Sequence, residues 1–196
     1  MIVGAIVTVV LVARGSGAGP TPTLPPTPSP TLNPAALASP GTPSGSPIDG
    51  IQCQTMEQVA YHIHAHLAVY VDGTSRVIPE GIGVTPPRHE VLTDAGWFVE
   101  SGKCFYWLHT HTADGILHIE SPTQTVYTLG QFFDIWGQPL TSTQLGPAAP
   151  GTVIAYVNGI KFTGDPRMIT LNKYDVIQLD VGTDVAPQTF QFPPGY

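Results

Sequence analysis

Apolar and polar residues alternate along several short segments of this chain, and a period of two residues predicts β-strands. The clearest segment is His62–Asp72, HIHAHLAVYVD, which runs into the turn dipeptide Asp72-Gly73. The other segments with strand character are Cys104–His111, Gly115–Glu120, Val153–Val157 and Asp175–Val181. Turn dipeptides Asp114-Gly115 and Asn158-Gly159 adjoin three of them. We therefore predict a mainly β fold, a β-sandwich or a barrel-like arrangement of antiparallel hairpins.

One short segment, 128–136, has the pattern of a helix. Thr128 and Gln131 have the spacing of a capping box, and Gly137 is suited to end the helix. The apolar side chains between them are Phe132, Phe133, Ile135 and Trp136. A single short helix is expected here.

The first 50 residues do not carry the period of a folded domain. Within 1–14, an apolar run of twelve residues precedes Arg14. This run fits a signal-peptide core or the remnant of a signal anchor, and the alternative is a buried N-terminal strand. Residues 15–50 are rich in Pro, Thr, Ser and Gly, which predicts a disordered, partly polyproline-II linker. This leaves 51–196 as a single histidine-rich β domain.

Charge and hydropathy exclude two classes of protein. Seven basic residues against fourteen acidic ones give a net charge of −7, so the basic patch of a nucleic-acid-binding protein is absent from the sequence. No apolar stretch reaches the roughly 20 residues that span a bilayer, which excludes a multi-pass membrane protein. The membrane is expected as a partner only through the N-terminal anchor.

The two cysteines, Cys53 and Cys104, precede the two groups of histidines. An extracytoplasmic chain, membrane-anchored or secreted at a cell surface or in a periplasm-like compartment, favours a disulfide between them. Two thiolate metal ligands are the alternative, although the cysteines lie far from the histidine spacing of a zinc finger.

Histidine is the most informative residue type, because all seven histidines lie between His62 and His118. Six of them form two groups, His62, His64 and His66, and then His109, His111 and His118. Strand alternation places the first three on one face, opposite a core-facing apolar row. His89, in the loop-like Pro86-Pro87-Arg88-His89, is expected to be exposed.

The loop at Asp114-Gly115 decides which residue lies opposite His118. A two-residue loop pairs His118 with His111, and a four-residue loop, Thr112–Gly115, pairs it with His109. Both registers place His118 on the face of the other two histidines, whereas a three-residue loop would turn it away.

Three imidazoles that converge from neighbouring strands form a donor set that zinc accepts, with a fourth position open. Copper, nickel and iron also accept imidazole. His62, His64 and His66 are expected to add ligands, to build a second site or to support the first one. The carboxylates nearest in sequence, Glu57, Glu120 and Asp114, are candidates to orient a histidine N–H.

The motifs HIHAHLAVYVDG, IPEGIGV, CFYWLHTHTADGILHIESP and YTLGQFFDIWGQPL, within His62–Leu140, resemble a family of uncharacterised bacterial extracytoplasmic domains. Members of this family are usually anchored to a membrane through a Pro-rich linker. The resemblance implies a cell-surface or periplasm-like setting and no particular activity.

Three functions are consistent with these features. The first is an extracytoplasmic domain that binds copper or zinc for sequestration, delivery or storage. The second is a metal-dependent enzyme with an open three-histidine site, either a hydrolase or hydratase or a copper oxidoreductase, with Phe105–Trp107 lining a cleft. The third is a structural surface or fibre subunit that self-associates through its C-terminal segment, Thr189–Tyr196. A pH sensor built from clustered imidazoles is a further alternative.

Overall fold

The computed structural model describes residues 36–94 and 96–196, all of which belong to one compact unit, Leu32–Tyr196. The predicted signal anchor, 1–14, and most of the predicted linker, 15–35, lie outside the described residues. Within the part of the chain that the structure describes, no helix is long and apolar enough to cross a membrane.

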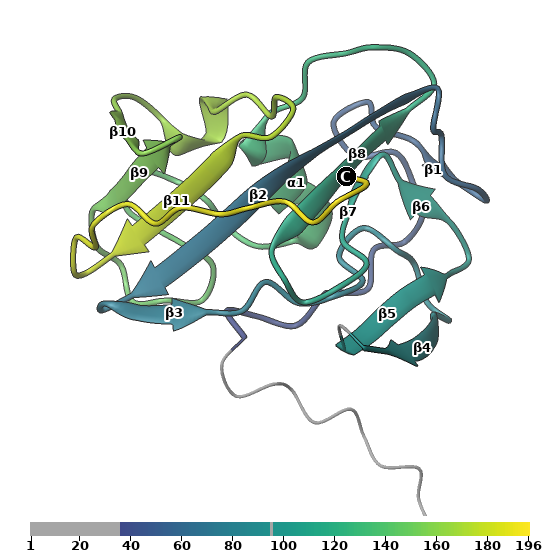
Figure 1. The fold of residues 1–196 in the computed structure, drawn as a ribbon, viewed down its shortest axis with the longest axis horizontal. Helices are drawn as coiled ribbons and strands as arrows, with labels where there is room; N and C mark the ends of the chain where they lie inside the picture. The colour runs from purple at the N-terminus through teal and green to yellow at the C-terminus, as the bar shows by residue number, and fades with distance from the viewer. Residues whose placement is uncertain (1–35, 95) are drawn as a thin grey trace, which may run out of the picture. The chain divides into compact units, whose positions relative to one another are not determined.

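Seven strands form one mixed sheet around the long central strand β2 (Tyr61–Val71), as Figure 1 shows. The order across the sheet is β10 (Ile160–Phe162), β9 (Val153–Val157), β11 (Val176–Val181), β2, β8 (Ile116–Ser121) and β7 (Leu108–His109), with β3 (Thr74–Arg76) also paired to β2. Only the pair of β11 and β2 is parallel among the described strands of this sheet. The predicted mainly β fold is confirmed, although the described strands close no barrel.

Two small sheets flank the main one. Strand β1 (Cys53–Gln54) pairs with β6 (Phe105–Tyr106), and β4 (His89–Thr93) pairs with β5 (Gly96–Ser101). The segment predicted as one strand, Cys104–His111, is therefore divided between two sheets. The division falls at Trp107, whose indole N–H donates a hydrogen bond to the Gln54 side chain at 2.9 Å.

Two of the three predicted hairpin turns are two-residue loops. Val71 pairs with Thr74 around Asp72-Gly73, and Val157 pairs with Ile160 around Asn158-Gly159. All four loop residues have positive φ angles, the conformation that Asp-Gly and Asn-Gly turns adopt most readily. These turns fix the register of β2 with β3 and of β9 with β10.

The one described α-helix, α1 (Leu129–Trp136), forms where the sequence predicts it. The Thr128 side chain accepts a hydrogen bond from the Gln131 N–H, the Gln131 side chain accepts one from the Thr128 N–H, and Gly137 ends the helix in the left-handed conformation. Figure 1 shows α1 behind β2 and β8. Its buried side chains join the core with a row from β2, made of Ile63, Ala65, Leu67 and Val69.

Residues 36–50, which the sequence analysis assigns to the linker, pack against the domain. Leu37 is buried in the main core, and the Trp136 indole N–H donates a hydrogen bond to the Ser39 carbonyl at 2.7 Å. The packed region thus begins upstream of the boundary at residue 51. The composition of 36–50 did not predict this packing, because its few apolar side chains stand among many Pro, Thr and Ser residues.

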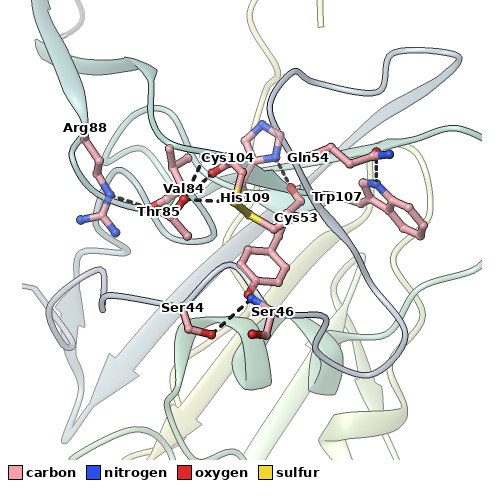
Figure 2. Close-up of a disulfide and its surroundings, with 11 residues drawn as sticks. Ser44, Ser46, Cys53, Gln54, Val84, Thr85, Arg88, Cys104, Trp107 and His109 are labelled. Atoms are coloured by element: carbon pink, nitrogen blue, oxygen red, sulfur yellow. Dashed lines mark hydrogen bonds between the residues drawn. A yellow bond between two sulfur atoms is a disulfide. The ribbon is translucent and has the colours of Figure 1, made fainter.

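The predicted disulfide between Cys53 and Cys104 is present, and Figure 2 shows it with its surroundings. It joins β1 to the residue before β6, and His109 is among the residues around it. From its sequence separation of 51 residues, the crosslink stabilises the fold by about 4 kcal/mol. The bridge also excludes the alternative of two thiolate metal ligands.

The C-terminal strap, which we define as residues 183–196, crosses the face of the main sheet opposite α1. Figure 1 shows it in yellow, running in front of β11 and β2 and ending beside β8. Backbone N–H groups of Val185 and Gln188 donate hydrogen bonds to the buried side chains of Asp180 and Gln178 on β11. The strap therefore covers the face of its own sheet to which the histidines of β2 belong.

Candidate metal centre

Histidines form one row across three neighbouring strands of the main sheet. His118 on β8 pairs with His64 on β2 and with His109 on β7, and the next row pairs His62 with Glu120. Because alternate strand residues share a face, these side chains lie on the side of the sheet opposite α1. The pair of His109 and His118 is the register that the four-residue loop predicts, and it excludes the two-residue loop.

His111 lies in the loop after β7, and strand β5 fixes its side chain. Its Nδ1 donates a hydrogen bond to the Val99 carbonyl at 2.6 Å, and the Val99 N–H donates to the His111 carbonyl at 2.9 Å. The Phe98 ring stacks on the imidazole with 4.7 Å between ring centroids. These contacts place His111 Nε2 3.1 Å from His109 Nε2.

The contact between these two nitrogens is unfavourable without a cation. His109 Nδ1 donates a hydrogen bond to the Tyr106 carbonyl at 2.8 Å, and a neutral imidazole has a single N–H, so Nε2 of both His109 and His111 carries a lone pair. Burial, together with the imidazoles of His111 and His118, lowers the pKa of His109 well below its usual value, which disfavours a proton between them. Donation to a carbonyl also orients a histidine for metal binding.

Glu120 brings a buried negative charge to the same place. Its side chain is 2% exposed, and its Oε1 lies 3.2 Å from His118 Nδ1 and 3.0 Å from His62 Nε2. Its Oε2 lies 4.0 Å from His109 Nε2 and has no hydrogen-bond partner among the described residues. A buried carboxylate oxygen without a partner is costly, and a cation at this position would compensate it.

The ligand atoms fall into two groups whose members lie within 4.8 Å of one another. The inner group consists of His109, His111, His118 and Glu120, which are all buried. The outer group consists of His62, His64 and His118. In the outer group His64 Nε2 lies 2.9 Å from His62 Nε2 and 3.2 Å from His118 Nδ1. Burial, followed by the charge of His62, lowers the pKa of His64 to about 4.

His66 and Asp114 lie outside both groups and make other contacts. His66 shares the face of His64, but its Nε2 donates a hydrogen bond to the Asp114 carbonyl at 3.1 Å, and the Phe190 ring stacks on it at 3.6 Å. The Asp114 carboxylate accepts a hydrogen bond from the Ile116 N–H at 2.9 Å and so supports the turn. The structure thus brings together five of the six histidines predicted to bind metal.

Glu57 lies at the edge of the inner group. Its Oε1 is 3.2 Å from His111 Nε2, the nitrogen that faces the other ligands, and its side chain is 34% exposed. Burial and the charge of Glu120 raise the pKa of Glu57. The sequence predicted that Glu57 and Glu120 orient histidine N–H groups. The structure places the Glu120 carboxylate among the ligand atoms of the inner group and leaves Glu57 outside both groups, in contact with His111.

The remaining candidate residues are distributed as follows. His89 is exposed, as predicted, and its Nδ1 contacts Glu100 Oε2 at 3.0 Å. Of the aromatic residues expected to line a cleft, Phe105 lies beside His109, with 5.5 Å between ring centroids. Tyr106 and Trp107 instead pack with the main core.

Two contributors to the site could not be predicted from the sequence. Strand β5 fixes His111 through Val99, and the strap places Tyr196 against His64 with 4.8 Å between ring centroids. Both are long-range contacts with no local sequence signal. Glu120, in contrast, was a candidate from the sequence, and it stands two residues after His118 on the same strand and therefore on the same face.

Comparison with protein-family models, with curated proteins and with solved structures found no match to this chain. Its function has to be derived from the geometry of the site.

Proposed function

We propose that this domain binds a transition-metal ion, copper or zinc, in an extracytoplasmic compartment, and that it sequesters, delivers or stores the ion. The observation that carries this proposal is the inner group, in which three imidazoles and one carboxylate converge in a buried place. Such a cluster of neutral imidazoles with an unpartnered carboxylate oxygen is costly to bury unless a cation joins it.

The number of ligands favours holding an ion over acting on a substrate. His109, His111, His118 and Glu120 offer one ligand atom each and can fill all positions of a tetrahedral ion. Catalytic zinc sites instead have three protein ligands and an open position for water. The strap also lies over the neighbouring imidazoles, with Tyr196 against His64 and His118.

The donor atoms narrow the choice of metal. Imidazole nitrogen suits zinc, copper, nickel and iron, and a carboxylate oxygen favours zinc or copper(II) over the softer copper(I). No thiolate is present, because both cysteines are in the disulfide. Copper(II) or zinc is therefore the proposed cargo.

The disulfide indicates an oxidising, extracytoplasmic environment. We also propose that residues 1–14 anchor the protein to a membrane and that the protein belongs to the bacterial domain family that its motifs resemble. Both proposals agree with an extracytoplasmic compartment. Self-association through Thr189–Tyr196 also stays a prediction, and it would require the strap to leave the sheet that it covers.

A metal-dependent enzyme is the second candidate, and one observation favours it. The outer group offers three ring nitrogens, and the His62 side chain is 37% exposed. An ion there would have room for a water molecule of lowered pKa.

The proposal is tested by loading the full chain, purified from an oxidising compartment and treated with a chelator, with zinc(II) or copper(II) and then removing unbound ions. Elemental analysis is expected to find the ion retained by the wild type and lost from His109→Ala. His89→Ala, which removes an exposed imidazole, is the matched control and is expected to retain the ion. Wild-type protein that retains neither ion would overturn the proposal, provided that circular dichroism shows it to be folded.

The same samples separate the two candidate functions. In protein loaded with a single equivalent of copper(II), small exogenous ligands such as azide are expected to leave the spectrum unchanged, because protein atoms fill the coordination sphere of the inner ion. A large spectral change on adding azide would favour the enzyme.

A further inference from the structure

Two side chains connect the inner and outer groups. His118 belongs to both groups, but a neutral imidazole has a single lone pair and binds one ion. Glu120 belongs to the inner group, yet its Oε1 contacts His62 and His118, which are members of the outer group. We infer that the centre is dinuclear, with Glu120 bridging an inner and an outer metal ion. This inference rests on the proposed function and goes beyond a single bound ion.

The two oxygen atoms of Glu120 face different histidines. Oε1 lies 3.0 Å from His62 Nε2 in the outer group, and Oε2 lies 4.0 Å from His109 Nε2 in the inner group. Oε2 is buried and lacks a hydrogen-bond partner within the described part of the chain. A carboxylate that gives one oxygen to each of two ions suits the separation of about 3.5–4 Å found in two-metal sites.

Hydrogen bonds alone do not satisfy the outer group. His64 Nε2 contacts ring nitrogens of both His62 and His118, at 2.9 and 3.2 Å. A ring nitrogen either donates one proton or accepts through one lone pair, so it can satisfy only one of these contacts. An ion bound to Nε2 of both His62 and His64 would resolve the conflict, and His118 Nδ1 would then donate its proton to Glu120 Oε1.

The two sites differ in their access to solvent. The inner ligands are all buried, whereas the His62 side chain is 37% exposed. An ion at the outer site is therefore expected to exchange first, and an ion at the inner site is retained longer. In a protein that delivers metal, the outer site would be the place of entry and transfer.

The test is a titration of the full-length, metal-free protein with copper(II), followed by elemental analysis and electron paramagnetic resonance. The wild type is expected to bind two equivalents, and the signal of the first equivalent is expected to weaken as the second binds, because ions bridged by a carboxylate couple magnetically. His62→Ala changes a partly exposed side chain and is expected to bind one equivalent with an uncoupled signal. His89→Ala, the control, is expected to bind two.

Failure of this inference differs from failure of the proposed function. A wild type that saturates at one equivalent, with His109→Ala binding none, would overturn the dinuclear centre and leave single-ion binding intact. Two equivalents that persist in His62→Ala would also overturn it, because the second ion would then lie elsewhere. No retained copper or zinc in a folded wild type would overturn both.

Discussion

The histidines of this protein are predictable as a group but not one by one. Strand alternation placed His62, His64 and His66 on one face, and the structure confirms this. Strand alternation did not distinguish His64, which lies in the cluster, from His66, which contacts the Asp114 carbonyl and Phe190 instead. The difference comes from the strand partner, because His64 pairs with His118 whereas His66 pairs with Ile116.

The buried imidazoles predict that the metal-free protein is destabilised by acid. Burial lowers the pKa of His64 from 6.5 to about 4, and that of His66 likewise to about 4. In the unfolded chain each histidine regains its usual pKa, so between these values the unfolded state binds protons that the folded state does not. The free energy of unfolding therefore falls as the pH is lowered from 6.5 towards 4, by about 1.4 kcal/mol per pH unit for each such histidine.

Urea unfolding of the chelator-treated protein at about pH 7 and about pH 5 measures this effect. His109 and His118 have pKa values lowered in the same direction and add to it. Equal or greater stability at the lower pH would show that the imidazoles are not held neutral in the folded state.

At the scale of elements, local sequence predicted the helix, the two short turns and most of the strands, because caps and turn dipeptides act over a few residues. It did not predict that Cys104–His111 is divided between two sheets, since the pairing of β6 with β1 joins residues about fifty positions apart. It also missed the parallel pair of β11 with β2. Strand type and face are local properties, whereas strand partners are not.

A substitution at Gly83 tests whether metal binding depends on the position of β7. A Cβ at this position would lie 2.3 Å from the Leu108 carbonyl oxygen and 3.0 Å from His109 Cβ. Gly83→Ala is therefore expected to displace β7 and to lower metal affinity by about 10-fold or more, although no ligand residue is substituted. The measurement is a competition titration against a chelator.

Gly159→Ala is the matched control for Gly83→Ala. Gly159 also has a positive φ, but nothing lies within 4 Å of its added Cβ. It carries the same kind of backbone strain far from the site. Equal losses of affinity in the two variants would show that general destabilisation, and not the position of β7, is responsible.

At the scale of the whole molecule, two connections hold the histidine-bearing strands in place, and the sequence predicted one of them. The disulfide ties β1 to the residue before β6, as expected for paired cysteines in an oxidising compartment. The strap, which one of the three sequence hypotheses docks on a neighbouring molecule, lies on its own sheet with Phe190 against His66. Aromatic residues in a Pro-containing tail do not identify the surface that they cover.

Removal of the disulfide by Cys53→Ser and Cys104→Ser together is expected to lower the free energy of unfolding by about 4 kcal/mol. The crosslink restricts the unfolded chain, so the loss should appear in urea unfolding of metal-free protein. A change below about 1 kcal/mol would mean that the crosslink contributes little to the stability of the fold.

The strap predicts control over the rate of metal loss. Tyr196 packs against His64 and His118, so Tyr196→Ala is expected to speed the transfer of bound metal to a chelator severalfold. Phe192→Ala is the control, since this ring contacts Tyr174 and Phe190 and no histidine among the described ring contacts. Stopped-flow transfer measurements that show equal rates in wild type and Tyr196→Ala would contradict a covering role.

X-ray absorption at the copper or zinc edge of metal-loaded protein tests the central claim most directly, because it reports the ligands of the ion itself. The structure predicts a shell of nitrogen and oxygen atoms at about 2.0 Å, with the outer scattering of several imidazoles and no sulfur at about 2.3 Å. A sulfur shell, or a spectrum without imidazole scattering, would contradict metal binding by this histidine and glutamate cluster.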